Sequence, residues 1–521
     1  MAADRIVNII NFIRGCEPRS EVDIVTPVVR QLELADRYSF PTTFLFQYDA
    51  LTPEFTGIFE GRFNDGMLEF GLWFEIVEPL CEACGIKWRG RFPWDWHSDV
   101  GFPVGYPPEE RIRLVDEAMR KFRETFGYYP RSFGSWVTDT VTLAHLSDRY
   151  GMDAFCNCKE QWGTDGYTLW GGYPGGAYYP SRTSMLSPAD RDIPGDMIKT
   201  PMFRMLGADP IYQYDFGLDE SSGSSSCQEV VSLEPIYFEE TGGGGMPAWV
   251  NWYFRETFSG RGLSLAYAQT GQENSFGWDQ MKKGLTDQFA KLDLMRHDGD
   301  VKIMTLGDTG RVFSRKYSDT PNLTITALSD WKDTSGGGKR SVWFASSKYR
   351  ANLLTDGNVP RIRDLYIFHM TDRYLESVCD SPSQYFENFP VADGNRFSGH
   401  GILSGMYFLD SEGERMTFES LEYEESGENA SVTLKGTAAG DVRIMFDRTS
   451  MTVSAEREFI LADETDPSSP HLPSVISVSG KETVFGYCGQ RYALKLSCGN
   501  FINGNGMPVI ASEGGRISFR F

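Results

Sequence analysis

The fold is decided by residues 6–46, which read IVNIINFIRGCEPRSEVDIVTPVVRQLELADRYSFPTTFLF. Residues 6–13 form a continuous apolar run with the length of a buried strand, and residues 42–46 form a second one. Between them, Thr26 and Pro27 provide a helix N-cap and a proline at the first helical position. An apolar stripe of helical spacing follows. Strand, helix and strand in this rhythm predict a parallel sheet.

The same rhythm continues along the first part of the chain. Further apolar strand candidates are found at residues 68–76, 131–137, 154–156, 202–206, 263–268 and 301–305. A clear amphipathic helix begins at Pro107-Pro108 and stops at Gly127. About eight strand–helix units over roughly 310 residues fit a (β/α) barrel of the TIM type, with seven or eight strands.

From about residue 320 the pattern changes to short alternating strands separated by turns. Examples are residues 341–345, 431–434 and 451–455. Such strands predict a C-terminal β-sandwich. We therefore expect an α/β fold with a barrel domain over residues 1–318 and a β-sandwich domain over residues 319–521. Two segments rich in serine and glycine, 221–227 and 242–245, bracket a flexible or inserted segment.

The amino-acid composition indicates which classes of binding partner and which cellular compartment to expect. Of the 521 residues, 72 are acidic and 50 are basic, and the net charge of −22 argues against nucleic acid and anionic membrane as partners. No apolar run approaches the roughly 20 residues needed to span a bilayer, and the N-terminal stretch lacks the features of a secretory signal. Cys81 and Cys84 form a CxxC on a helical pattern, without a second pair to complete a zinc site. We expect buried thiols and a reducing, cytoplasmic setting.

Residues 153–182 open as a short buried strand and continue as a long loop that mixes polar and aromatic side chains. These are Asn157, Lys159, Glu160, Gln161, Trp162, Asp165, Tyr167, Trp170, Tyr173, Tyr178 and Tyr179. Long loops without secondary structure are uncommon in compact domains unless they serve function. Aromatic faces beside amides and carboxylates suit a sugar ring, whose C–H faces stack and whose hydroxyls hydrogen-bond. The alternative is a surface loop whose rings pack against neighbouring elements.

Three segments of the first half carry a resemblance to a known family. They are residues 32–46 (LELADRYSFPTTFLF), 69–73 (EFGLW) and 126–136 (FGYYPRSFGSW). They are similar to the "ATFF" strand with its preceding helix, the "EIG-x-H" strand and the "tG-x-x-P-x-x-F-R-x-P-y-G" segment of the glycoside hydrolase/deacetylase superfamily, the NodB-like barrels. The resemblance covers about 300 residues and implies a (β/α) barrel that acts on carbohydrate.

The metal site of that superfamily is not repeated in this sequence. The resemblance implies an aspartate on the first strand and two histidines after the third, but Arg14 stands at the first position and Trp73 at the second. The sequence therefore predicts no metal and no other cofactor. The architecture also resembles the inverting exo-sialidases of glycoside hydrolase family 156. Their aspartate on strand one and mid-barrel histidine correspond here to Arg14 and the Ser135-Trp136 pair.

Carboxylates follow several predicted strands, at the end where active sites of parallel barrels lie. The catalytic candidates are Asp49, Asp139, Glu160 and Glu273. Glycoside hydrolysis needs one protonated carboxyl and one ionised carboxylate. We expect Glu273 to be the acid, because its apolar neighbours Phe276 and Trp278 raise the pKa of a carboxyl. Asp49 follows the polar Gln47 and is expected to be the base. The alternative for each is a solvated or salt-bridged residue.

Arginines share these strand ends, at positions 14, 19, 131, 182 and 204. They favour capture of a substrate carboxylate, and the alternative is internal pairing with Asp49, Asp139 or Asp209. The expected substrate-binding side chains are Arg14, Gln47, Glu75, Trp136, Asn157, Gln161, Asp165, Tyr167, Trp170 and Arg204.

Together these patterns predict a metal-independent, sialidase-like glycoside hydrolase. It is expected to act in exo mode on an acidic sugar, such as sialic or uronic acid, by carboxylate acid/base catalysis. A non-catalytic carbohydrate-binding barrel is the first alternative, and a NodB-like polysaccharide deacetylase is the next. The expected partner is a carbohydrate substrate, and both a monomer and a homo-oligomer stay open.

Overall fold

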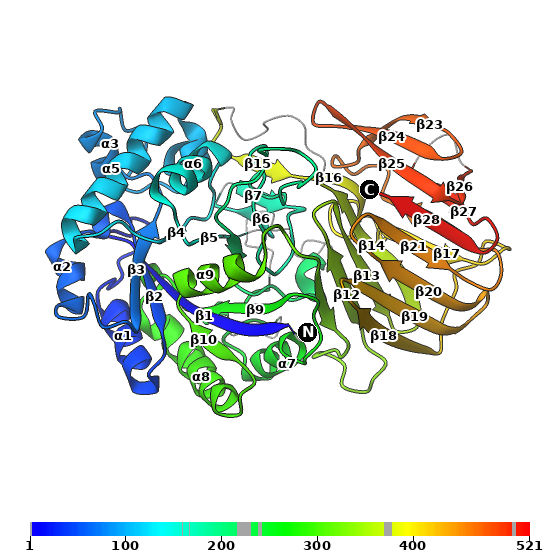
Figure 1. Cartoon of the computed structure of the whole chain (residues 1–521), viewed down its shortest axis with the longest axis horizontal. Coiled ribbons are helices and arrows are strands. Elements are labelled where there is room, and N and C mark those ends of the chain that lie inside the picture. The colour runs from blue at the N-terminus through cyan, green and yellow to red at the C-terminus, as the bar shows by residue number, and fades with distance from the viewer. Residues whose placement is uncertain are drawn as a thin grey trace.

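The computed structural model describes residues 3–158, 160–165, 167–215, 231–237, 242–368, 378–502 and 507–521. Figure 1 shows two parts side by side, a barrel of strands surrounded by helices and a block of antiparallel strands packed against it. This confirms the predicted fold class, a (β/α) barrel followed by a C-terminal β-sandwich.

The barrel strands are parallel to one another. They are β1 (Asp4–Ile13), β2 (Thr42–Phe46), β3 (Leu68–Trp73), β4 (Ser132–Gly134), β5 (Ala154–Asn157), β8 (Met202–Arg204), β9 (Leu265–Thr270) and β10 (Lys302–Met304). Pairing runs from β1 through β2, β3, β4 and β5 to β8, while β9 and β10 pair with β1. The rings of Phe203 on β8 and Tyr267 on β9 approach to 5.2 Å. The barrel is therefore nearly closed, and in the described part its unpaired junction lies between β8 and β9.

Helices surround the barrel (Figure 1). They are α1 (Thr26–Tyr38), α2 (Pro53–Thr56), α3 (Glu78–Ala83), α4 (Ser98–Gly101), α5 (Pro108–Phe126), α6 (Thr140–His145), α7 (Pro247–Thr257), α8 (Trp278–His297) and α9 (Leu306–Lys316). In α5, Val115, Met119, Phe122 and Phe126 of the predicted apolar stripe are buried, together with Leu114 and Ala118 beside them. The helix ends at Gly127, whose φ of 84° is a left-handed conformation that glycine adopts without strain.

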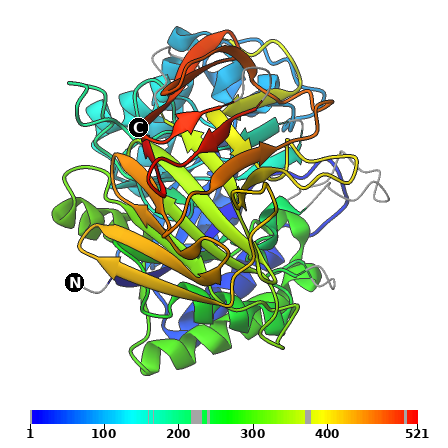
Figure 2. The same ribbon diagram turned by 90° about the vertical axis from the view of Figure 1, so that its right-hand side faces the viewer.

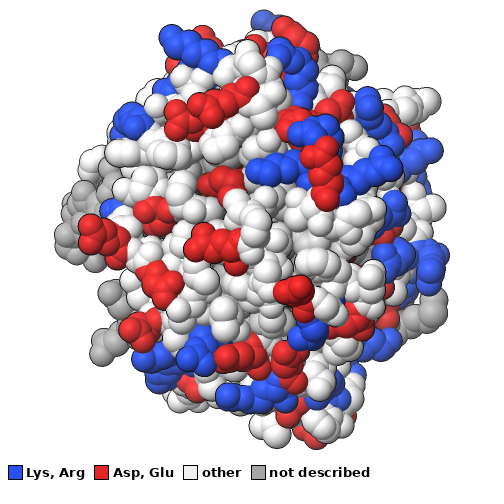
Figure 3. Space-filling model, turned by 90° about the vertical axis from the view of Figure 1, so that its left-hand side faces the viewer, with Lys and Arg blue, Asp and Glu red and all other residues white. Residues whose placement is uncertain are grey.

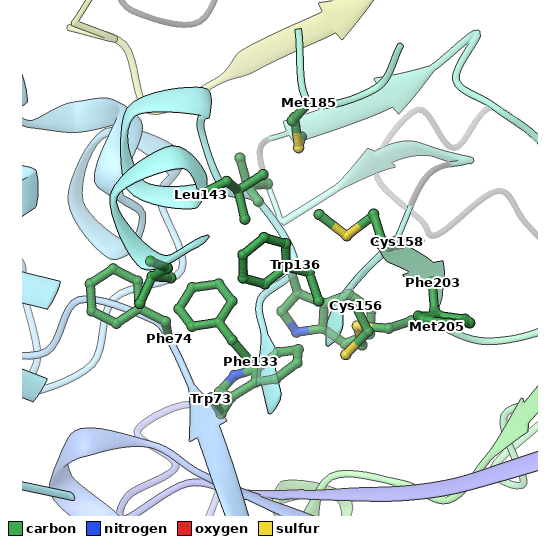
Figure 4. Packing of buried hydrophobic residues seen from close by; sticks show 14 of the residues in the cluster. Trp73, Phe74, Phe133, Trp136, Leu143, Cys156, Cys158, Met185, Phe203 and Met205 are labelled. Atoms are coloured by element: carbon green, nitrogen blue, oxygen red, sulfur yellow. The ribbon is translucent and has the colours of Figure 1, made fainter. Parts of the chain in front are cut away.

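Aromatic rings pack in the barrel interior, and Figure 4 shows Trp73 and Trp136 in this cluster. Phe12 stacks on Trp73 with 3.9 Å between ring centroids, and Trp136 meets both rings edge-on. A Cβ atom on Gly134 would lie 2.7 Å from Leu45 and 3.0 Å from Trp73. The interior below the strand ends is thus a packed core.

The C-terminal part contains two antiparallel sheets. The first comprises β11 (Leu323–Ala327), β12 (Arg340–Ala345), β13 (Tyr349–Asp356), β14 (Val359–Ile367), β16 (Phe389–Asp393), β17 (Gly405–Leu409), β22 (Ile460–Glu464), β26 (Asn500–Phe501) and β27 (Val509–Ala511). The second comprises β18 (Ser420–Ser426), β19 (Asn429–Thr437), β20 (Gly440–Phe446), β21 (Ser450–Ser454), β23 (Ser474–Val478), β24 (Glu482–Tyr487), β25 (Gln490–Cys498) and β28 (Arg516–Arg520). Figure 2 shows strands of the second sheet in front of the lime-coloured strands of the first. Side chains of both share one apolar core, in which Phe344 stacks on Phe446.

The stretch after β5 differs from its prediction as a long loop. It contains a hairpin of β6 (Gln161–Thr164) and β7 (Tyr167–Trp170), and β7 pairs in parallel with β15 (Gln384–Glu387) from the C-terminal part. The sequence pattern did not predict this hairpin. The strand that pairs with β7 is β15, which lies more than 200 residues away in the chain and leaves no local signal. Residues 161–164 and 167–170 of the predicted loop are therefore strands of a small sheet that joins the two parts of the molecule, and the rest up to residue 182 lies outside the named strands.

Most predicted strands and helices are present, with shorter ends. The strands predicted at residues 68–76 and 131–137 end at Trp73 and Gly134, where the parallel pairing of β3 with β4 ends. The barrel elements end with α9, and β11 opens the antiparallel part, while the domain limits 1–318 and 319–521 stay a prediction. Residues 221–227 lie outside the described part.

Charged side chains are distributed over the barrel side that faces away from the C-terminal sheets. Figure 3 shows acidic and basic groups interspersed with uncharged surface on this side. Within the described ranges, no helix combines the length and apolar character needed to cross a membrane.

Candidate active site at the barrel mouth

Arg14 is the centre of a buried group of polar side chains at the carboxyl end of the barrel strands. It follows β1, and its guanidinium binds Glu75 in bidentate fashion, with Nε–Oε2 at 3.1 Å and Nη2–Oε1 at 2.9 Å. Its third nitrogen, Nη1, lies 3.0 Å from Glu273 Oε1. Gln47 Nε2 donates to Glu75 Oε2 at 3.0 Å. Three strand ends far apart in the sequence are thus joined by one guanidinium, as parallel topology allows.

Strand alternation explains why Glu75 points inward. Glu69, Gly71 and Trp73 occupy the inward positions of β3, and Glu75 continues this alternation past the last paired residue. Glu75 is 1% exposed and Arg14 is 2% exposed. A buried ion pair of this kind depends on both partners being present.

Glu273 is the carboxyl of this group that is best suited to hold a proton. Ser275 Oγ donates to Oε1, the same oxygen that faces Arg14, while Oε2 is buried and has no hydrogen-bond partner among the described residues. Burial raises the pKa of Glu273 to about 7, and the Arg14 charge opposes this rise. A carboxyl with one ion-paired oxygen and one unpartnered oxygen can exchange a proton near neutral pH.

The segment after β9 is fixed to the end of β1 by its neighbouring residues. Asn274 accepts from the Arg14 backbone N–H and donates to the Arg14 carbonyl, both at 2.9 Å. Gly271 has a φ of 113°, and a Cβ atom there would lie 2.0 Å from the Ile10 carbonyl oxygen. Only glycine permits this close approach. Glu273 therefore has a rigid support.

Aromatic and charged side chains cover the Arg14 group on the solvent side. The Trp94 ring stacks on the Arg14 guanidinium at 4.1 Å and on that of Arg19 at 4.7 Å. Arg19 pairs with Glu17 at 2.8 Å and lies 3.5 Å from Asp165. The side chains of Arg19 and Asp165 are about one-third exposed. We call these residues the rim of the Arg14 group, because they lie between it and solvent.

Asp49, in the short 3-10 helix η1 (Tyr48–Ala50), lies at the same rim. Its Oδ1 accepts from the Gly15 backbone N–H at 3.1 Å. Burial raises the pKa of Asp49 to about 6, against hydrogen bonds from Gly15 and the Cys16 thiol. A Cβ atom on Gly15 would lie 2.6 Å from the Asp49 backbone, so glycine is needed for this contact.

Two further catalytic candidates are held in internal contacts away from Arg14. Asp139 is fully buried at the N-terminus of α6, where it accepts from the Thr142 backbone N–H at 3.0 Å and pairs with Arg111 at 3.1 Å. Glu160 is 1% exposed and pairs with Arg350 of β13. Asp139 therefore has the contacts of a helix cap, and Glu160 those of a link between the two parts.

The expected substrate-binding side chains fall into two groups. Arg14, Gln47 and Glu75 form the buried Arg14 group, and Asp165 lies beside Arg19 at its rim. The remaining six, Trp136, Asn157, Gln161, Tyr167, Trp170 and Arg204, are buried as well. Trp170 donates its indole N–H to Asp393 of β16 at 2.7 Å, and its ring packs on Tyr214. It lies in the contact between the two parts, so we leave it out of the site. The side chain of Trp162 lies outside the described part.

The arginines expected at the mouth are largely occupied by protein groups. Arg131 pairs with Asp153 at 2.7 Å, and Arg182 pairs with Asp148 at 2.9 Å. Arg204 donates to backbone carbonyls. Internal pairing, the alternative weighed from the sequence, therefore describes Arg131 and Arg182 better than capture of a substrate carboxylate, with Asp153 and Asp148 as partners in place of the expected Asp49, Asp139 or Asp209.

Sequence reasoning did not single out Ser275, Trp94 or Arg350 as site residues. Ser275 lies two positions after Glu273, and Trp94 belongs to an aromatic stretch at residues 88–97, so both had a local signal. Arg350 had none, because it reaches Glu160 across 190 positions of sequence.

The described residues contain no group of three histidine, cysteine, aspartate or glutamate side chains arranged to hold a metal ion. Metal independence stays a prediction, which chelation of the purified protein can test.

Comparison with known proteins gives a relationship of fold. The chain matches no protein family model and no curated protein. A solved structure described as a glycoside hydrolase/deacetylase, from Parabacteroides distasonis, superimposes with a TM-score of 0.54 at 16% identity, over 74% of this chain and 91% of that one. The likeness is one of fold. Structures described as polysaccharide deacetylases from Mycobacterium smegmatis and Pseudomonas aeruginosa PAO1 have TM-scores of 0.35 and 0.36 at 11% and 12% identity. They cover 61% and 60% of this chain, and 93% and 91% of their own.

Proposed function

We propose that this protein is a carbohydrate-processing hydrolase that cleaves O-glycosidic bonds at the barrel mouth. The observation that carries the proposal is Glu273, a buried carboxyl with a pKa of about 7 and an unpartnered oxygen, fixed beside a second carboxylate on Arg14. Active sites of parallel barrels lie at this end of the strands. The fold shared with the Parabacteroides distasonis protein, which is described as a glycoside hydrolase/deacetylase, is in keeping with carbohydrate chemistry.

In this mechanism Glu273 is the general acid. Its Oε2 carries the proton and donates it to the glycosidic oxygen as the bond to the anomeric carbon breaks. Arg14 and Ser275 bind the other oxygen, so the carboxylate that remains after proton transfer keeps two hydrogen bonds. Arg14 is therefore a positioning residue that stabilises the ionised product state.

Asp49 is the proposed base. When ionised, it would accept a proton from the water that attacks the anomeric carbon. Its contacts with the Gly15 backbone N–H and the Cys16 thiol hold the carboxylate in place. Glu75 is fully engaged by Arg14 and Gln47, which suits a supporting role better than a reacting one.

The expected preference for an acidic sugar is a separate part of the proposal. Arg19 is the rim guanidinium with partial exposure, and it would have to exchange Glu17 or Asp165 for a substrate carboxylate. We infer a modest preference for uronides at most, because protein carboxylates compete for this side chain.

Hydrolysis of aryl glycosides tests the acid and base assignments. With a good leaving group, Glu273→Gln should retain more activity than it does with a natural glycoside, since little protonation is required. Asp49→Asn should lower both rates. The Glu273 assignment fails if Glu273→Gln hydrolyses a natural substrate within about tenfold of wild type, since general acid catalysis contributes roughly 10²–10⁴-fold.

A non-catalytic carbohydrate-binding barrel is the second candidate. It is favoured by the pairing of Arg14 with two carboxylates, which is also the arrangement of a purely structural ion pair. Binding of a glycan array without hydrolysis would support it, and release of acetate from acetylated glycans would support the deacetylase alternative instead.

A further inference from the structure

A cavity lies between the barrel and the C-terminal sheets, and we call it the seam cavity. Its volume is about 50 Å³, and its lining includes residues of β8, β9, β11 and β12, so that it adjoins the junction where β8 and β9 do not pair. Its polar lining includes Glu160, Arg204, Gln213, Glu256, Arg261 and Gln269. A buried water needs at least roughly 10–15 Å³ of such space, so the cavity has room for about three to five waters or one small molecule.

Two amide side chains of this lining make no hydrogen bond with any residue that the structure describes. Gln269 on β9 is 1% exposed, and Gln213, in the 3-10 helix η5 (Tyr212–Tyr214), is 5% exposed. The Oε1 atom of each amide is buried without a partner, as is Oε2 of Glu160. Buried polar groups in folded proteins are nearly always paired. Three unpaired groups from three separate segments around one cavity indicate a hydrogen-bonding occupant.

The charges around the seam cavity balance one another. Arg204 is 4% exposed, and within the described ranges no carboxylate oxygen lies within 4.0 Å of it. Glu160 is shared with Arg350, which also pairs with Asp364 at 2.6 Å. The two positive charges of Arg204 and Arg350 are balanced by the two negative charges of Glu160 and Asp364. A charged occupant would leave one buried charge uncompensated, which is unfavourable.

We propose that the seam cavity binds a small neutral polyol of about three carbons. A hydroxyl group both donates and accepts, so it can pair with the Glu160 oxygen, the two amides and Arg204. An anion would meet Glu160 and Glu256, and a cation would meet Arg204 and Arg261, which are in the lining as well. Because the lining comes from both parts of the chain, bound polyol would stabilise their association.

Saturation-transfer NMR on the full-length protein tests this proposal, with glycerol and 1-propanol as probes of equal carbon number. Glycerol should give a saturable signal and bind more tightly than 1-propanol. Gln269→Leu and Gln213→Leu should each weaken glycerol binding about fivefold, which corresponds to about 1 kcal/mol, the worth of one neutral hydrogen bond.

Gln31→Leu is the matched control. Gln31 on α1 is also 1% exposed with an unpartnered Oε1, but it does not line the seam cavity. Glycerol should bind this variant like the wild type. Circular dichroism checks that each variant is folded, and Ala208→Leu, which fills the cavity without removing a polar group, provides an independent block. Equal glycerol binding by the wild type and all folded cavity variants, or preference for 1-propanol, would overturn the proposal.

Discussion

Glu273→Gln should change how the stability of the protein depends on pH. In the folded state, burial raises the pKa of Glu273 from 4.5 to about 7. Folding therefore takes up a proton between these pH values. The stability contributed by this carboxyl is fully present below about pH 4.5 and is lost as the pH rises through about 7. At about 1.4 kcal/mol for each pH unit, the loss amounts to about 3 kcal/mol.

Urea unfolding at pH 5 and pH 8, followed by tryptophan fluorescence, measures this effect. Glutamine keeps the shape of the side chain and an oxygen for Arg14 but cannot ionise. The difference in unfolding free energy between wild type and Glu273→Gln should therefore change by about 2–3 kcal/mol between the two pH values, in favour of the variant at pH 8. Asp279→Asn is the control, because the Asp279 side chain is 91% exposed and should show no such change.

The same proton should govern activity. If Glu273 is the acid, kcat/KM should fall as the pH rises above about 7, and Glu273→Gln should lose this limb of the profile. If the difference in unfolding free energy between wild type and Glu273→Gln is equal at pH 5 and pH 8, the carboxyl of Glu273 is ionised in the folded state at both pH values. That result would refute the assignment of Glu273 as general acid.

Three further predictions concern the surrounding contacts. Arg14→Met should destabilise the protein by about 3–5 kcal/mol, because it leaves Glu75 and Glu273 buried without a counter-charge. A triple variant that also carries Glu75→Gln and Glu273→Gln should regain most of this stability, as measured by thermal unfolding. Trp170→Phe should lower the melting temperature through loss of the bond to Asp393 but leave KM for glycosides unchanged, whereas a raised KM with unaltered melting would return Trp170 to the site. Dialysis against EDTA should leave hydrolysis intact, and activity that is lost and then restored by zinc or cobalt would contradict metal independence.

The barrel strands could be predicted because local pattern and tertiary position agree in them. Residues 6–13 and 42–46 are mostly apolar and are buried throughout, as strands covered on both faces are, and α1 begins and ends within its predicted stripe. Parallel topology then brings the residues after β1, β2, β3 and β9 to one end. For this reason the structure assembles Arg14, Gln47, Glu75 and Glu273 from sequence candidates.

The roles of the arginines and of the aromatic residues after β5 could not be predicted, because they depend on contacts with residues far away in the sequence. Whether an arginine binds a substrate or a neighbouring carboxylate is decided by partners such as Glu75, which lies 61 positions from Arg14. The aromatic residues after β5 have the composition of a sugar-binding loop, yet Trp170 packs against β16. Composition describes what a side chain can do, whereas the partner strand decides which surface it meets.

The parallel pairing of β7 with β15 has a consequence for how the chain matures on the ribosome. Trp170 and its partner Asp393 are separated by 223 positions. At a synthesis rate of about 5–20 residues per second, roughly 11–45 s pass between synthesis of the β6–β7 hairpin and synthesis of β15 and Asp393, which pair with it. During this interval the nascent barrel exposes an unpaired strand edge beside its mouth, which is the kind of surface that recruits chaperones or misassembles. The hairpin reaches its final form only after roughly the first third of the C-terminal part has been made.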